Sequence, residues 1–383
     1  MNSKNTNQAN IEEWVKIYIA SILLIKVMQI PNSDILSTNR LGKIFSNTVA
    51  TYKYFWFVSI MQIHAKSDNP RIDVWDIVIR MVANAWYPIH YFRLSFGNSD
   101  SLFDIVIELQ RMTQIPIDAN ADTIINGLKE NLANKKIKKL LNILTLNVPY
   151  RFLRPWIDTS DDKEMVRRSQ TLENNCLYAL FRNGKDFYIM LNQGWNKYLH
   201  NHYNILVDFA YWNLTLFLQV RNPNVPAIPN KLIRPEVRNS LTKQHNYWDM
   251  VMTIGGPIHC IYTDKELHPM DYELDHFIPW SFVSHDLLWN LIPSDSSINS
   301  SKSNNLPDLN IYLPKLAKLQ HHSLQLMIKN NKESKVMEDF ISLGYTAREL
   351  ANMDGALFRE LYERTFNPIN QIALNMGFEI WKY

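Results

Sequence analysis

An acid, an imidazole, two amides and a lysine lie within about thirty residues in the C-terminal third of the sequence: Asp275, His276, Asn290, Asn299 and Lys302. An imidazole with an ordinary pKa of about 6.5 can deprotonate water near neutral pH. Carboxylate and amide oxygens are ligands that Mg²⁺ prefers, and a bound divalent cation stabilises the charge that develops on a phosphate. This set of side chains therefore matches the needs of phosphodiester hydrolysis.

The arrangement carries one geometric difficulty. Asp275 and His276 are neighbours in a predicted strand, and neighbouring strand residues point to opposite faces. Both can serve one site only if the strand ends, twists or bulges between them. Pro279 follows shortly afterwards and favours a strand end at this point.

The elements that must position these residues are short strands followed by helices. Runs of apolar and β-branched residues predict strands within Ile258–Tyr262, Tyr272–Ile278 and Asn290–Ile292. Helical spacing of apolar residues then predicts three helices, at Leu313–Asn330, Lys335–Leu343 and Gly355–Phe366. The chemistry therefore lies on a strand, a loop, a second strand and a helix start.

The spacing of this segment resembles a known motif. After Asp275-His276 comes a Pro three residues on, then Ser-Phe, an Asn fourteen residues after the His, another Asn nine later, and finally Lys302 and Pro307. The pattern is similar to the HNH nuclease motif (the ββα-metal or His-Me finger), and particularly to its version in RNA-guided CRISPR nucleases. The resemblance covers residues 257–310 without a gap in the motif.

The resemblance implies a role for each residue. Asp275 and Asn299 would bind Mg²⁺ or Mn²⁺, and His276 would be the general base. Asn290 would brace the loop and orient the base, and Lys302 would lie near the nucleic-acid backbone. The implied activity is metal-dependent endonuclease cleavage, with DNA favoured as the substrate because HNH relatives mostly cut DNA.

Some of these residues have structural alternatives. Asn299 is also a residue type favoured at a helix N-cap. Asp295 would replace Asn299 as ligand if the alignment slipped. Glu273 shares a strand face with Asp275 and is either an acid supporting the metal site or a solvated strand residue.

Cysteine usage and hydropathy exclude several classes of protein. Many HNH relatives carry zinc-binding cysteine pairs, whereas Cys176 and Cys260 are far apart here, so we expect no structural zinc and no secreted disulfide scaffold. The apolar run Ile17–Ile25 is much shorter than the ~20 residues of a membrane span. We therefore expect a cytoplasmic protein with no membrane association.

The rest of the sequence predicts a helical N-terminal part. We expect a mainly α fold with a small α+β unit: a disordered tail at 1–10, a helical region at 11–235 for sensing, assembly or DNA binding, and an HNH domain at 236–383. Four prolines between 221 and 235 favour a rigid, extended connector at this boundary. Helical patterns occur at Ile11–Gln29, Arg40–His64, Val74–Met81 extending towards Trp86, Ser101–Arg111, Ala121–Leu144, Gly194–Gln219 and Glu236–Met252. A strand pair with an Asn183-Gly184 turn is predicted at Phe181–Met190.

Charge is divided unevenly along the chain. Residues 1–250 carry a net charge of +8 and residues 251–383 one of −5, within a total of +3. Part of the positive charge is a cluster late in the predicted 121–144 helix, which is either a solvated helix end or a nucleic-acid-binding patch: Lys135, Lys136, Lys138 and Lys139. Four arginines extend the second interpretation: Arg151, Arg154, Arg167 and Arg168.

Three functions follow from these patterns. The first is a DNA endonuclease, which we expect to be a bacterial anti-phage effector. The second is a catalytically inactive nucleic-acid-binding or assembly module with a vestigial HNH unit, and the third is an RNase. A partner protein encoded nearby, such as an ATPase or a nucleotide-signalling enzyme, and oligomerisation are compatible with all three.

Overall fold

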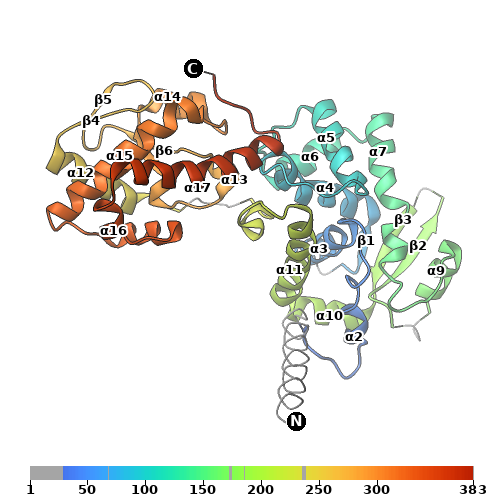
Figure 1. Cartoon of the computed structure of the whole chain (residues 1–383). Coiled ribbons are helices and arrows are strands. Elements are labelled where there is room, and N and C mark those ends of the chain that lie inside the picture. The colour runs from blue at the N-terminus through green and yellow to red at the C-terminus, as the bar shows by residue number, and fades with distance from the viewer. Residues whose placement is uncertain (1–28, 68, 172–174, 185, 235–238, 383) are drawn as a thin grey trace, which may run out of the picture. The chain divides into compact units, whose positions relative to one another are not determined.

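The computed structural model describes residues 29–67, 69–171, 175–184, 186–234 and 239–382 (Figure 1). The chain divides into two compact units. The first contains the described residues up to 85, with 97–115 and 121–217; the second contains 86–96, 116–120 and the described residues from 218 onwards. The expected tail at 1–10 and almost all of the expected helix at 11–29 lie outside the described residues.

The first unit is built of helices around a small antiparallel sheet. Its helices are α2 (Thr38–Leu41), α3 (Tyr52–His64), most of α4 (Val74–His90), α5 (Ser101–Thr113), α6 (Ala121–Glu130), α7 (Lys135–Thr145), α8 (Val148–Arg151), α9 (Asp162–Ser169), α10 (Gln193–Asn201) and most of α11 (Tyr203–Arg221). The sheet has the strand order β1-β3-β2, from β1 (Arg71–Asp73), β2 (Tyr178–Asn183) and β3 (Asp186–Leu191).

Helix α3 and the β2–β3 hairpin contribute to the core of the first unit. Helix α3 is buried over most of its surface, and the indole of Trp56 donates a hydrogen bond of 3.1 Å to the buried hydroxyl of Tyr178. The β2–β3 hairpin confirms the predicted strand pair, and its last paired residues are Asn183 and Asp186. Gly184 adopts a positive φ of 59°, which a side chain would make unfavourable.

Two of the predicted helices are divided in the structure. The helix expected at 121–144 is two helices, α6 and α7, because the chain turns between them and Asn134 caps the second by accepting from the Lys136 amide. The helix expected at 40–64 is replaced by the short α2, a turn region and α3. In both cases the apolar spacing continued through a turn, so the periodicity did not locate the break.

The second unit contains the short strands and the C-terminal helices. In chain order its elements are the 3₁₀ helix η2 (Ile228–Lys231), α12 (Thr242–Gly255), β4 (Ile258–His259), β5 (Glu266–Leu267), β6 (Glu273–His276), α13 (Trp280–Val283), η3 (Leu288–Asn290), β7 (Leu291–Ser294), α14 (Ser296–Lys302), α15 (Leu309–Lys329), η4 (Lys335–Leu343), α16 (Ala347–Ala351) and α17 (Gly355–Asn375). A mainly helical chain with a small strand-containing part is thus confirmed.

One hydrophobic core holds the second unit together. Helices α12, α15, α16 and α17 pack around the strands, with α15 in contact with the other three (Figure 1). The proline-containing segment before α12 is not simply an exposed connector, because Lys231 and Leu232 are buried within it. Among the described residues, none of the helices is both long and apolar enough to cross a membrane.

Candidate active site

The hairpin of β6 and β7 carries the Asp275-His276 pair. The two strands pair antiparallel in regular register, with Asp275 opposite Ile292 and His276 opposite Leu291. Strand β6 ends at His276, and Pro279 then caps the short helix α13. The described register contains no bulge between the two residues, and His276 is the last paired residue of β6, so the two side chains start on opposite faces of the strand.

Helix α14 lies against the face of β6 that carries the acids. Glu273 and Asp275 are two residues apart and share that strand face, while Asn299 and Lys302 are three apart and share a helix face. The two pairs meet: Asn299 Nδ2 donates to Glu273 Oε2 at 2.8 Å, and Lys302 Nζ donates to Asp275 Oδ1 at 3.0 Å. Asp275 and Asn299 therefore belong to one small polar surface between strand and helix.

Asp275 is almost completely enclosed. Its side chain is 3% exposed, and Oδ2 accepts from the hydroxyl of Tyr262 at 2.7 Å while Oδ1 accepts from Lys302. Lys302 is 0% exposed and also donates to the carbonyl of His276 at 2.7 Å. Burial lowers the pKa of the Lys302 ammonium, and Asp275 opposes that shift. Burial and the Asp275 charge both raise the pKa of the Tyr262 hydroxyl.

His276 is held by a carboxylate that sequence analysis did not single out. His276 Nε2 lies 2.9 Å from Asp286 Oδ1, and the two side chains are only 12% and 22% exposed. A carboxylate can only accept here, so the pairing assigns a proton to Nε2 and leaves Nδ1 with the lone pair. This is the tautomer control that a general base needs.

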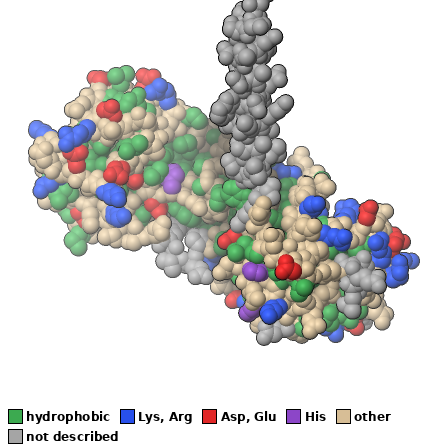
Figure 2. Space-filling model, turned by 90° about the horizontal axis from the view of Figure 1, so that it is seen from below, with side chains coloured by type: hydrophobic (Ala, Val, Ile, Leu, Met, Phe, Trp, Pro, Cys, Tyr) green, Lys and Arg blue, Asp and Glu red, His purple; other side chains and the backbone are tan. Residues whose placement is uncertain are grey.

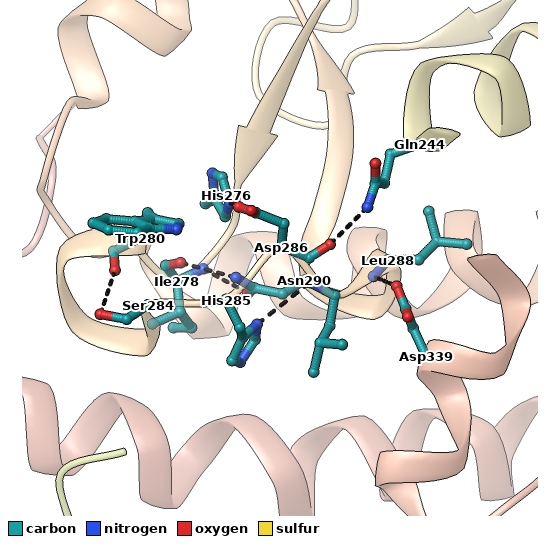
Figure 3. Close-up of polar contacts among 11 residues, drawn as sticks. Gln244, His276, Ile278, Trp280, Ser284, His285, Asp286, Leu288, Asn290 and Asp339 are labelled. Carbon is teal, nitrogen blue, oxygen red and sulfur yellow. Dashed lines mark hydrogen bonds and ion pairs between the residues drawn. The ribbon is translucent and has the colours of Figure 1, made fainter. Parts of the chain in front are cut away.

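The loop between β6 and β7 is fixed by Asn290. Its side chain is fully buried, Oδ1 accepts from the Ile278 amide at 2.9 Å, and Nδ2 donates to the Ile278 carbonyl at 2.9 Å (Figure 3). The two bonds close the loop across twelve residues and satisfy the backbone N–H and C=O groups of buried Ile278. Asn290 thus lies where a side chain that braces the loop is needed.

Other elements fix the backbone around Asp286. Gln244 in α12 donates to the Asp286 carbonyl at 3.0 Å, and Asp339 in η4 accepts from the Leu288 amide at 2.8 Å (Figure 3). In α17, Phe366 packs edge-on against Phe277, with ring centroids 5.3 Å apart. Helices far along the chain therefore determine where the histidine and its carboxylate lie.

A cavity of about 640 Å³ opens beside this loop. Its lining includes Asp286, His285, Ser284 and Trp280, together with Gln244 of α12. Burial is the main cause that lowers the pKa of His285 to about 4, and the nearby His276 lowers it further. His285 is therefore uncharged at neutral pH.

Two interpretations from the sequence change with the structure. Asn299 is not the N-cap of α14, because Asp295 holds that position and accepts from the Ser297 amide. Lys265 and then Ser297 lower the pKa of Asp295 to about 2. Lys302 is buried rather than displayed on the surface, so contact with a phosphate would require the ammonium to leave Asp275.

The donor set suits a hard cation. Within the described part of the chain, no group of three or more His, Cys, Asp or Glu residues could hold a metal ion. Mg²⁺, however, is commonly bound by one or two protein oxygens together with water and substrate phosphates. Asp275 and the amide oxygen of Asn299, whose nitrogen faces Glu273, provide such oxygens on neighbouring elements. Each Asp275 oxygen keeps a second lone pair beyond its present bond.

Comparison with known proteins identifies this region. The family model described as HNH endonuclease matches residues 260–308. The chain contains an HNH endonuclease domain. The match spans β5, the β6–β7 hairpin and α14, and so includes every residue of the polar surface described above. Comparisons with curated proteins and with solved structures give no match.

The predicted lysine cluster lies in the first unit, outside the HNH domain. Lys135, Lys136, Lys138 and Lys139 are exposed at the start of α7, while Ile137 between them is buried. The interpretation as a helix C-terminus, where the dipole favours cations, is wrong because these residues form the first turns of the helix. On the face seen in Figure 2, basic and acidic side chains are mixed.

Proposed function

We propose that the protein is a metal-dependent endonuclease that hydrolyses phosphodiester bonds in DNA. One observation carries the proposal: the residues that match the HNH family include both a histidine paired with a carboxylate and an amide beside an acid. His276, at the end of β6, is bonded to Asp286, and Asn299 of α14 is bonded to Glu273 of β6. These side chains come from β6, from the loop between α13 and η3, and from α14. Together they would provide a base and hard oxygen donors within one short motif.

The chain's own residues have distinct tasks in this proposal. His276 Nδ1 removes a proton from water while Asp286 holds the proton on Nε2 and stabilises the imidazolium that forms. Asp275 and Asn299 would hold Mg²⁺ or Mn²⁺, and Asn290 keeps the loop in place. The bound cation would supply charge stabilisation at the scissile phosphate and the leaving 3′ oxygen.

The test is cleavage of supercoiled plasmid DNA with and without Mg²⁺. We expect cleavage only with the metal, and a loss of about 10²–10⁴-fold in His276→Ala, the usual contribution of general-base catalysis. His322→Ala is the matched control, because His322 is an exposed histidine of the same unit on α15. Full activity of His276→Ala would remove His276 from the role of base.

The substrate and the biological role need separate assays. RNA and DNA of the same sequence, given in parallel, distinguish a DNase from an RNase. The anti-phage role that we propose predicts fewer plaques on bacteria that express the intact chain than on bacteria that express His276→Ala. Equal plaque numbers would leave the nuclease proposal standing and refute the defence role.

We also propose that the lysine cluster of α7 contributes to DNA binding. The four side chains are exposed, and the positive charge near a helix N-terminus opposes the helix dipole, so a polyanion would relieve it. Lys135→Gln with Lys136→Gln should weaken DNA binding in a salt-dependent way. Binding that stays unchanged at low salt would exclude the patch.

A further inference from the structure

A second concave site lies wholly within the first unit. It is a cavity of about 660 Å³ formed by three segments that are distant in sequence: the loop before α3 with the start of α3, the residues before α5, and α8 with the residues after it. Volumes of this size are typical of pockets for small ligands. None of these segments belongs to the HNH motif.

Three cations line this cavity. They are Lys53 at the start of α3, Arg151 at the end of α8, and Arg154 just after it. None of the thirteen described lining residues is acidic, and in the described part of the chain no carboxylate forms an ion pair with Lys53, Arg151 or Arg154. Positive charge therefore accumulates here without an internal counterion.

The position of Lys53 shows that the charges are close together. Burial lowers the pKa of its ammonium, and Arg154 and Arg151 lower it further. Nζ donates to the carbonyls of Ile44 at 3.1 Å and Asn47 at 3.4 Å, which ties the ammonium to the loop that forms the wall. An ammonium has three donors, so one remains for a ligand.

The rest of the lining offers neutral hydrogen-bonding groups. Hydroxyl and amide side chains contribute to the wall, from Ser46, Asn47, Thr48, Ser99, Ser101 and Asn147. The acid between the lining residues Ser99 and Ser101 turns inward: Asp100 is 3% exposed, and Oδ2 accepts from both the amide and the hydroxyl of Thr51 at 2.6 Å while Oδ1 accepts from the Leu102 amide. Asp100 thereby joins the starts of α3 and α5, two of the segments that form the cavity.

We propose that this cavity binds the phosphate group of a nucleotide, either free or within a nucleic-acid strand. Two guanidinium groups and an ammonium around hydroxyl and amide donors are the chemistry that recognises a phosphate dianion or diester. The aromatic ring of Tyr52 and the exposed Val49 also line the cavity and offer apolar surface to the attached nucleoside. The proposal does not require the HNH site to be active.

The test is direct binding to the full chain carrying His276→Ala, in EDTA, so that no cleavage occurs. Inorganic phosphate, a nucleoside monophosphate and a short single-stranded oligonucleotide are titrated separately by calorimetry. Arg151→Gln with Arg154→Gln should weaken binding by at least about tenfold, since each lost charge-assisted bond to phosphate has a large effect. Both arginines are exposed, so we expect the double variant to fold.

The matched control removes the same charge elsewhere in the unit. Lys163→Gln with Lys197→Gln changes two exposed cations, on α9 and α10, and should leave the affinity within about twofold. Tighter binding of the monophosphate identifies a free nucleotide as the ligand, and tighter binding of the oligonucleotide identifies a strand. The proposal is wrong if none of the three binds, or if Arg151→Gln with Arg154→Gln binds as tightly as the control.

Discussion

The bond between His276 and Asp286 provides the sharpest test of the proposed catalytic site. Asp286→Asn keeps the size of the side chain and removes its charge, so the imidazolium that forms during water activation loses its counterion. The two side chains are 12% and 22% exposed and their polar atoms are 2.9 Å apart, so solvent can replace the lost partner only in part.

The expected loss follows from that geometry. A hydrogen bond to a charged partner contributes about 1.5–3 kcal/mol, and about 1.4 kcal/mol corresponds to tenfold in rate. Asp286→Asn should therefore slow single-turnover cleavage of DNA by about 10- to 150-fold. The folded state should remain, because Gln244 and Asp339 hold the backbone of this loop independently of the Asp286 side chain.

A double-mutant cycle separates orientation of the base from a structural role. In the His276→Ala background Asp286 has no imidazole to orient, so adding Asp286→Asn should change the residual rate by less than about twofold. Asp308→Asn is the control, because Asp308 caps α15 and asparagine caps a helix equally well. An equal loss in both backgrounds would refute the assignment of Asp286 to His276.

Three further substitutions test the buried polar groups. Asn290→Ala leaves two backbone groups of buried Ile278 unpaired and should lower the free energy of unfolding by about 2–4 kcal/mol, measured by urea denaturation. Lys302→Met leaves Asp275 without its buried cation and should cost about 3–5 kcal/mol, and Mg²⁺ should raise the melting temperature of this variant more than that of the wild type. Burial lowers the pKa of Lys231 from 10.5 to about 7, so its ammonium destabilises the fold fully below pH 7 and progressively less up to pH 10.5. Lys231→Met should therefore raise the melting temperature most below pH 7, by the equivalent of up to about 5 kcal/mol, and a gain that is the same at pH 10 would contradict this assignment.

Local patterns predicted the parts of the fold that depend on local rules. The sequence predicted three such features: the Asn183-Gly184 turn, the strand that contains Asp275, and the amphipathic spacing of α5 and α15. The boundaries between α6 and α7 were not, because an apolar stripe can continue across a turn that only packing makes favourable.

The candidate site likewise combines residues that the sequence predicted with contacts that only the structure shows. Asp286 lies in a loop with no sequence signal, and only the turn after α13 brings it to His276. A search of the sequence for a carboxylate within ten residues of each side of the motif histidine would have found Asp286 together with Glu266, Asp271, Glu273 and Asp275, without selecting it. Arg151 and Arg154 were visible as part of a basic stretch, but their common cavity with Lys53 was not.

The sequence by itself determined which residue types are available and how far apart they lie: the motif from Asp275 to Lys302, its hairpin and its following helix. Only the tertiary structure decided the state of those groups. Lys302 is buried against Asp275 because β6, α14 and Tyr262 enclose both, and spacing along the chain cannot reveal that enclosure. The physical reason is that burial and pairing depend on contacts between segments that fold together from distant positions, whereas a motif records only neighbours in sequence.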